Sequence, residues 1–172
     1  MNMLREQIII RPPVADDFAR WKELWDGYNA FYGREGQTAL PTEITKTTWG
    51  RFFDSYDSVN ALVAESSGRI LGLVHYIYHR STIQIVPTCY LQDLFTAEEA
   101  RGKGVGKALI EAVCEEARAA GVPRIYWHTH ESNATAMLLY NKVAEKGCVA
   151  GNSLFSIIHF SVHSTSFREV IN

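Results

Sequence analysis

The sequence has few of the features that mark disulfide-rich, membrane-spanning or strongly charged proteins. Its three cysteines are widely spaced and none has C-x-x-C spacing, which argues against a disulfide framework or a zinc site and suits a reducing compartment. No apolar run approaches membrane-spanning length, and the isoleucine run near the N-terminus is too short for a signal peptide. The net charge is only −2, so no overall field attracts nucleic acid or an anionic membrane. We therefore expect a cytoplasmic protein with neither kind of partner.

Linkers and internal repeats are also missing. No stretch rich in Pro, Gly or Ser is long enough to divide the chain, which predicts one domain over residues 1–172. Hydrophobic residues make up 47% of the sequence, an ordinary share for a globular protein, and the length is sufficient for a substantial core.

The periodicity of apolar residues predicts a mixed α/β domain. Strands are expected at 7–11, 61–65, 70–78, 88–96, 125–130 and 154–162. Helices are expected at 14–31, from 42 to 53, from about 104 to 120, and from 132 onwards.

The stretch EEARGKGVGKALIEAV, residues 98–113, places three glycines and three basic residues directly before a helical pattern. Glycine lets the backbone approach closely with positive φ, and a helix N-terminus adds free amides and the positive end of its dipole. This combination predicts a pyrophosphate cradle, although a solvated basic helix start is the simpler alternative. The expected binding residues are Arg101, Gly102, Lys103, Gly104, Val105, Gly106 and Lys107.

The residue types at fixed positions of this stretch distinguish three kinds of phosphate-binding motif. A P-loop requires Ser or Thr after Gly106-Lys107, where Ala108 stands, and a Rossmann fingerprint requires a third glycine where Lys107 stands. The pattern [QR]-x-x-G-x-[GA] is satisfied by Arg101, Gly104 and Gly106. The stretch therefore resembles the acyl-coenzyme A motif of the GCN5-related N-acetyltransferases (GNAT).

A second segment, THESNATAMLLYNKV, strengthens this resemblance with Asn133 at a helix start and Tyr140 two turns later. Asn133 either caps the helix or bonds the pantetheine arm. In the family, a tyrosine such as Tyr140 donates a proton to the departing thiolate. Together with WKELWDGYNAFY and YLQDLF, the segment looks like the Hpa2-type histone and polyamine acetyltransferase branch. The resemblance covers about 7–146, and the tail at 147–172 is atypical.

The resemblance implies a single-domain acyl-CoA N-acyltransferase fold: a mixed, mostly antiparallel sheet flanked by helices, with splayed central strands. It implies that acetyl-CoA, as acetyl donor, lies in this opening, with its pantetheine arm along Leu94, Phe95 and Thr96. A backbone amide near Phe95 is the expected oxyanion donor. It also favours a homodimer.

The residue that removes the proton from the amine is open at this stage. Strand alternation predicts that Tyr90, Gln92, Leu94 and Thr96 share one face and that Asp93 lies on the other. Tyr90 is a poor base at neutral pH, so Glu131, His128 and Asp93 are the candidates, with Glu131 ranked first. The predicted catalytic residues are therefore Tyr140 and Glu131.

Two function classes follow. The first is an N-acetyltransferase that moves the acetyl group of acetyl-CoA to a primary amine by direct attack, on a polyamine, another amino compound or a lysine side chain. A longer acyl-CoA, or a protein amine, is a variant of this reading. The second is a non-catalytic CoA-binding or regulatory domain. No metal is expected, because the pairs His75/His79 and His128/His130 lie in strand-like runs whose spacing does not converge on one ion.

Overall fold

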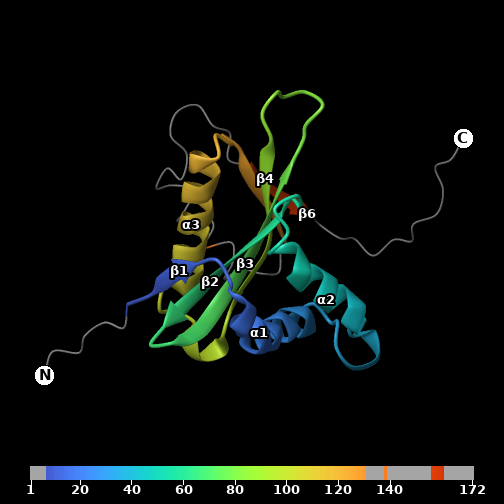
Figure 1. The fold of residues 1–172 in the computed structure, drawn as a ribbon, viewed down its shortest axis with the longest axis vertical. Coiled ribbons are helices and arrows are strands. Elements are labelled where there is room, and N and C mark those ends of the chain that lie inside the picture. Colours follow the sequence, from blue (N-terminus) through green and yellow to red (C-terminus); the bar gives the residue numbers. More distant parts are fainter. Residues whose placement is uncertain (1–6, 131–137, 139–155, 161–172) are drawn as a thin grey trace, which may run out of the picture.

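The computed structural model describes residues 7–130, residue 138 and residues 156–160. The described strands form one sheet in the order β1 (Ile9–Arg11), β2 (Val59–Ser66), β3 (Arg69–His79), β4 (Thr88–Thr96), β5 (Ile125–His130) and β6 (Ser156–Phe160). The described helices are α1 (Phe18–Phe31), α2 (Thr42–Arg51) and α3 (Val105–Ala119), with short 3-10 turns η1 (Ala15–Asp17), η2 (Gly36–Thr38) and η3 (Glu98–Ala100). In Figure 1, α3 lies on one side of the sheet and α1 and α2 lie on the other.

The sheet is mixed, as predicted. The pairs β1–β2, β2–β3 and β3–β4 are antiparallel, whereas β4–β5 and β5–β6 are parallel. The parallel β4–β5 pair requires a crossover, and α3 supplies it between the two strands. The strand expected at 154–162 corresponds to β6, while the helix expected at 14–31 begins at Phe18 because its first turn is the separate 3-10 turn η1.

The helix α3 packs tightly on one face of the sheet. The apolar stripe of α3 is fully buried and includes Val105, Leu109 and Val113. Gly72 of β3 lies opposite this stripe. A Cβ added there would be 2.8 Å from Val105 Cγ1 and 2.9 Å from the backbone oxygen of Phe95. The start of α3 therefore rests directly on the sheet at the level of Phe95.

Replacing Gly72 by Ala should destabilise the protein by about 1–3 kcal/mol, because the Phe95 carbonyl cannot move as a side chain would. The measurement is thermal unfolding followed by circular dichroism. Gly50→Ala is the matched control, because that glycine lies in α2 with no atom within 4 Å of the added Cβ. The control should be neutral or slightly stabilising. Equal melting temperatures for Gly72→Ala and the wild type would contradict the tight contact.

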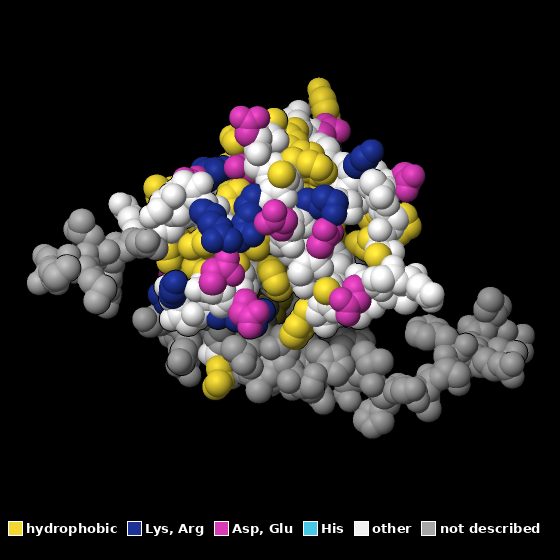
Figure 2. All heavy atoms as spheres, turned by 90° about the horizontal axis from the view of Figure 1, so that it is seen from below, with side chains coloured by type: hydrophobic (Ala, Val, Ile, Leu, Met, Phe, Trp, Pro, Cys, Tyr) yellow, Lys and Arg dark blue, Asp and Glu magenta, His cyan; other side chains and the backbone are white. Residues whose placement is uncertain are grey.

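The surface at the lower end of Figure 1 mixes charges of both signs. Figure 2 shows Lys and Arg side chains interspersed with Asp and Glu side chains on this face. Among the described residues, ion pairs join Arg20 to Glu23 and Glu99, and Arg69 to Glu99. No helix in the described part of the chain is long and apolar enough to cross a membrane.

The cysteines follow the sequence-based expectation only in part. Cys89 is a free thiol, and its burial raises its pKa to about 12, so it stays protonated and is a poor nucleophile at neutral pH. Cys114 is disulfide-bonded, which contradicts the expectation of free thiols at that position.

Candidate active site

The glycine-rich turn after η3 has the backbone conformation that an anion cradle requires. Gly102 has φ of 75° and Gly104 has φ of 89°, and Gly104 is the N-cap of α3 without any side-chain cap. An added Cβ would meet no atom within 4 Å at either glycine, so the space in front of the turn is open. The positive φ explains why both positions are glycine.

The first turn of α3 presents its amides to this space. Within the described part of the chain, the N–H groups of Val105, Gly106 and Lys107 have no backbone acceptor, as is usual in a first helical turn. Arg101 and Lys103 are exposed, and no ion pair in that part includes either one. Lys107 instead pairs with Glu111 at 2.8 Å. The turn therefore offers convergent donors and two basic side chains, which suits a pyrophosphate.

Among the described strands, β5 leaves the edge of β4 next to the cradle unpaired, as the predicted splay requires. The β4–β5 register covers only Cys89 to Leu91 of β4, whereas the register with β3 continues to Thr96. The Ala97 amide donates to the Leu71 oxygen of β3 at 2.8 Å. By antiparallel alternation, the backbone groups of Phe95 also face β3, and those of Leu94 and Thr96 face the open edge. Leu94 and Thr96 can thus pair with an extended ligand arm.

A β-bulge at Gln92 changes which residues of β4 share a face. His75 pairs with Asp93 and its neighbour Tyr76 pairs with Leu91, so Gln92 is an extra residue. Asp93 therefore points to the α1 side together with Tyr90, and the predicted alternation, which placed them on opposite faces, is wrong. Phe95 is on the same side, where the missing side chain of Gly27 in α1 leaves room for its ring.

Asp93 is buried and belongs to a network that the sequence analysis missed. Its residue exposure is 5%, and its Oδ2 is 3.0 Å from Nδ1 of His75, which is 2% exposed. The Nε1–H of Trp21 donates to Nε2 of His75 at 3.1 Å. Because an indole N–H can only donate, His75 Nε2 accepts, and its Nδ1–H donates to the carboxylate. His75 is therefore a neutral imidazole that orients Asp93.

The negative charge of Asp93 acts on three tyrosine side chains. Burial raises the pKa of Tyr28, and the negative charge of Asp93 and its hydrogen bond with the tyrosine hydroxyl raise it further. Burial followed by the same charge also raises the pKa of Tyr32 and Tyr90. All three hydroxyls thus remain protonated at neutral pH. Among the ion pairs of the described residues, none joins Asp93 to Lys or Arg, so a buried carboxylate has no cationic partner there.

The other candidate residues fall into two groups. His128 is exposed and lies edge-on to Tyr90 and Tyr126, with ring centroids 5.4 and 5.6 Å apart, so its ring packs against aromatic side chains of β4 and β5. Glu131, Asn133 and Tyr140 lie outside the described residues, and their predicted roles stay predictions.

The histidines do not form a metal centre in the described part of the chain, where no group of three or more His, Cys, Asp or Glu side chains could hold an ion. His75 is in the core with Trp21 and Asp93, whereas His79 contacts the Tyr126 hydroxyl at 2.9 Å. The two members of this pair therefore serve different contacts.

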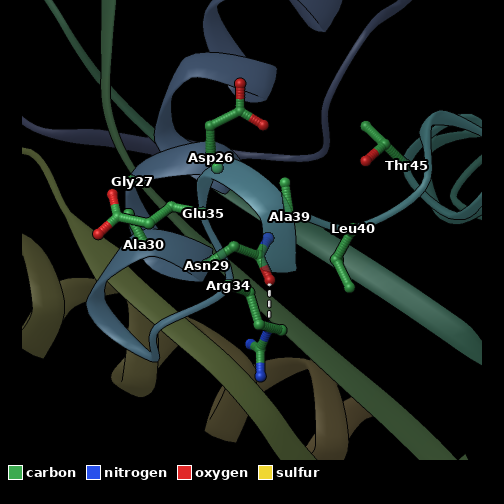
Figure 3. A pocket seen from close by; sticks show the side chains of 10 residues that line it. Asp26, Gly27, Asn29, Ala30, Arg34, Glu35, Ala39, Leu40 and Thr45 are labelled. Carbon is green, nitrogen blue, oxygen red and sulfur yellow. Dashed lines mark hydrogen bonds between the residues drawn. The ribbon is translucent and has the colours of Figure 1, made fainter.

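A pocket of about 430 Å³ lies between α1, η2 and α2 (Figure 3). Its lining includes Asp26, Asn29, Arg34 and Glu35, but neither Asp93 nor Phe95. The lining of this pocket therefore contains neither member of the His75–Asp93 contact. Arg34 belongs to both regions, because its guanidinium also lies over the rings of Tyr28 and Tyr32.

Comparisons with known proteins show the family of the chain. Residues 21–144 match the family model described as the acetyltransferase (GNAT) family. The D-amino-acid N-acetyltransferase HPA3 of Saccharomyces cerevisiae is 35% identical over 147 residues, which cover 84% of this chain and 89% of that protein. The uncharacterized N-acetyltransferase YhfO of Bacillus subtilis is 26% identical over 133 residues, covering 77% and 86%.

Solved structures show the same fold. A transcriptional regulator from Bacillus halodurans C-125 superposes with a TM-score of 0.69 at 19% identity, over 86% of this chain and 99% of that one. The aminoglycoside N-acetyltransferase AAC(6')-Iy in complex with CoA gives a TM-score of 0.67 at 16% identity, over 80% and 87%. The yeast relative is consistent with the predicted Hpa2-type branch. The chain therefore belongs to the acetyltransferase (GNAT) family, which confirms the predicted fold class and the predicted enzyme class, an N-acetyltransferase.

Proposed function

We propose that this protein transfers the acetyl group of acetyl-CoA to the primary amine of a small molecule by direct attack on the thioester. The observation that carries the proposal is the arrangement along β4. The anion cradle follows β4 in the chain. Among the described strands, none pairs with the backbone edge of β4 at Leu94 and Thr96, and the buried carboxylate of Asp93 comes directly before Leu94.

The cradle and the open edge are suited to the two ends of acetyl-CoA. Arg101, Lys103 and the amides from Gly104 to Lys107 would hold the pyrophosphate. The pantetheine arm would pair with Leu94 and Thr96 as an added strand. Because the Phe95 amide faces β3, an amide of the open edge is the better oxyanion donor than Phe95 itself.

Asp93 is the group that we assign to the acceptor amine. A buried carboxylate that has no Lys or Arg partner attracts a cationic ligand. The acceptor amine is protonated at neutral pH, and this ammonium must lose one proton before the nitrogen can attack. Asp93 would take that proton from the ammonium, directly or through water. The nitrogen then bonds to the acetyl carbon, the carbon–sulfur bond breaks, and the thiolate receives a proton from Tyr140. The new amide nitrogen releases its second proton, which restores the Tyr140 hydroxyl through solvent. Glu131 stays the alternative base.

The test is calorimetric titration with acetyl-CoA, followed by thiol release in the same preparation with a panel of amines. Binding and release with an amine would support the proposal. Binding without release for any amine would favour the non-catalytic CoA-binding alternative. No binding of acetyl-CoA would overturn the assignment of residues 101–107 as the cradle.

Tyr140→Phe should leave the affinity for acetyl-CoA unchanged and lower kcat roughly 10²-fold or more, because the hydroxyl acts only on the leaving thiolate. The measurement is steady-state thiol release at saturating acetyl-CoA. Tyr56→Phe is the matched control, because Tyr56 is 98% exposed and far from β4 in sequence. An unchanged kcat for Tyr140→Phe would remove this residue as the acid.

We further propose a cytoplasmic homodimer, because acetyl-CoA is made inside cells and the Hpa2-type resemblance favours a dimer. For the acceptor, the printed functions of two similar proteins, D-amino-acid acetylation and aminoglycoside acetylation, support a small amine over a protein side chain. Size-exclusion chromatography with light scattering tests the dimer, and a monomeric mass would contradict it.

A further inference from the structure

Arg34, three residues beyond the end of α1, is held in one orientation by a buried amide. Its Nε donates to Oδ1 of Asn29 at 2.7 Å, as the dashed line in Figure 3 shows. Asn29 is only 4% exposed, and its own amide is oriented by a 2.8 Å hydrogen bond to the Trp25 oxygen. The Arg34 backbone N–H also donates to the backbone oxygen of Asn29 at 2.9 Å. The side chain is therefore fixed before any ligand arrives.

Two aromatic rings support the guanidinium. Its Cζ is 5.8 Å from the centroid of Tyr28 and 5.5 Å from the centroid of Tyr32, within the range of cation–π contacts. A hydrogen bond and ring contacts of this kind reduce the conformational entropy that Arg loses when it binds an anion.

The terminal nitrogens of Arg34 have no acidic partner in the described part of the chain. No ion pair recorded there includes Arg34, and of the two acids that line the same pocket, Asp26 pairs with Lys22 at 2.6 Å. The other, Glu35, forms no described ion pair with the neighbouring guanidinium. The contact with Asn29 uses only the Nε–H, so the two terminal groups are available for a forked anion.

The same tyrosine connects this cation to the buried carboxylate. Arg34 lies over the ring of Tyr28, and the Tyr28 ring is 6.5 Å from the ring of Phe95, which is on the same face of β4 as Asp93. The negative charge of Asp93 also contributes to the raised pKa of Tyr28. A positive and a negative group therefore lie on either side of one tyrosine side chain. An amino acid carries the complementary pair, a carboxylate and an ammonium on one carbon atom.

We propose that Arg34 binds the carboxylate of the acceptor while Asp93 receives its amino group, so that the substrate class is a carboxylate-bearing amine, such as an amino acid. This inference rests on the proposed acetyl transfer at β4. A polyamine offers no anion to Arg34 and would be repelled by it, so the geometry disfavours polyamines. The assignment makes Arg34 a specificity-determining residue.

The experiment compares Arg34→Gln with the wild type on D- and L-amino acids, on the corresponding amino-acid amides and on spermidine. For amino acids, kcat/KM should fall roughly tenfold to a hundredfold through KM, whereas the amides should be unaffected. Arg34→Lys keeps the positive charge but not the two parallel N–H donors of the guanidinium, so its kcat/KM for amino acids should fall less than that of Arg34→Gln. Arg118→Gln, an exposed arginine of α3, is the matched control with unchanged kinetics. Equal wild-type efficiency on amino acids and their amides would overturn the proposal, as would an equal loss on both.

A binding measurement separates this proposal from the proposed acetyl transfer. Calorimetry with a free amino acid, in the presence of CoA, should give heat with the wild type and none with Arg34→Gln. If no amine is acetylated but this binding persists, the carboxylate site stands and the transfer fails. If spermidine is acetylated and amino acids neither bind nor react, the transfer stands and the carboxylate site falls. Unfolding curves confirm that the variants are folded.

Discussion

Replacing Asp93 by Asn should lower kcat/KM for the acceptor amine by roughly 10²- to 10⁴-fold while the affinity for acetyl-CoA stays unchanged. The variant removes the negative charge that faces the acceptor and the group that takes its proton. The Asn oxygen can still accept from His75 Nδ1–H, so the Trp21–His75 contact is retained. The measurement is thiol release at saturating acetyl-CoA, with the dissociation constant of acetyl-CoA from calorimetry.

Stability should not explain the loss in Asp93→Asn. A buried carboxylate without a Lys or Arg partner costs free energy, so its replacement by a neutral amide of the same shape should leave the melting temperature unchanged or raised. Glu115→Gln, on the exposed face of α3, is the matched control for removal of an acid. If Asp93→Asn keeps the wild-type rate, the base is elsewhere, and Glu131→Gln becomes the decisive variant.

The second large effect is expected at the cradle, where Gly104→Glu should weaken acetyl-CoA binding by at least about a hundredfold. The substitution places a carboxylate where the pyrophosphate would lie, and it imposes a side chain at φ of 89°. No atom of the described part of the chain lies within 4 Å of the added Cβ, so the loss would come from the ligand and not from a clash in the fold. Calorimetric titration measures it directly.

The control for Gly104→Glu is a glutamate at another glycine with positive φ, outside the cradle, where the backbone strain should be similar. Gly68 occupies the turn between β2 and β3 with φ of 75° and no atom within 4 Å of an added Cβ. Gly68→Glu should therefore lower the melting temperature to a similar extent and leave acetyl-CoA binding intact. Similar losses of binding in both variants would mean that backbone strain, and not the added charge, is responsible.

The backbone conformation of the glycine-rich turn is the feature of the candidate site that local sequence predicts well. The positive φ of Gly102 and Gly104 and the helix start at Val105 depend on residues within a few positions of one another. Glycine spacing, basic residues and helical periodicity all report on such short-range structure. The same is true of the order of strands and helices, and for that reason the predicted fold class is confirmed.

The acceptor side depends on contacts between distant parts of the chain. Strand alternation placed Asp93 on the wrong face because the bulge at Gln92 is set by the register of β4 against β3, which no pattern within β4 reveals. A buried histidine in an otherwise apolar strand was a usable signal for His75, but its partner Trp21 is 54 positions away. Arg34 gave no signal at all, because its role comes from Asn29 and two tyrosine rings.

Local sequence predicts the family, the order of elements and the conformation of the glycine-rich turn, since glycine torsions and helix starts are properties of a few consecutive residues. The contacts of Asp93 with His75, of His75 with Trp21 and of Arg34 with two tyrosine rings follow only from the tertiary structure. Those relations arise from strand register and from the packing of α1 on the sheet, where residues far apart in the chain share one buried volume.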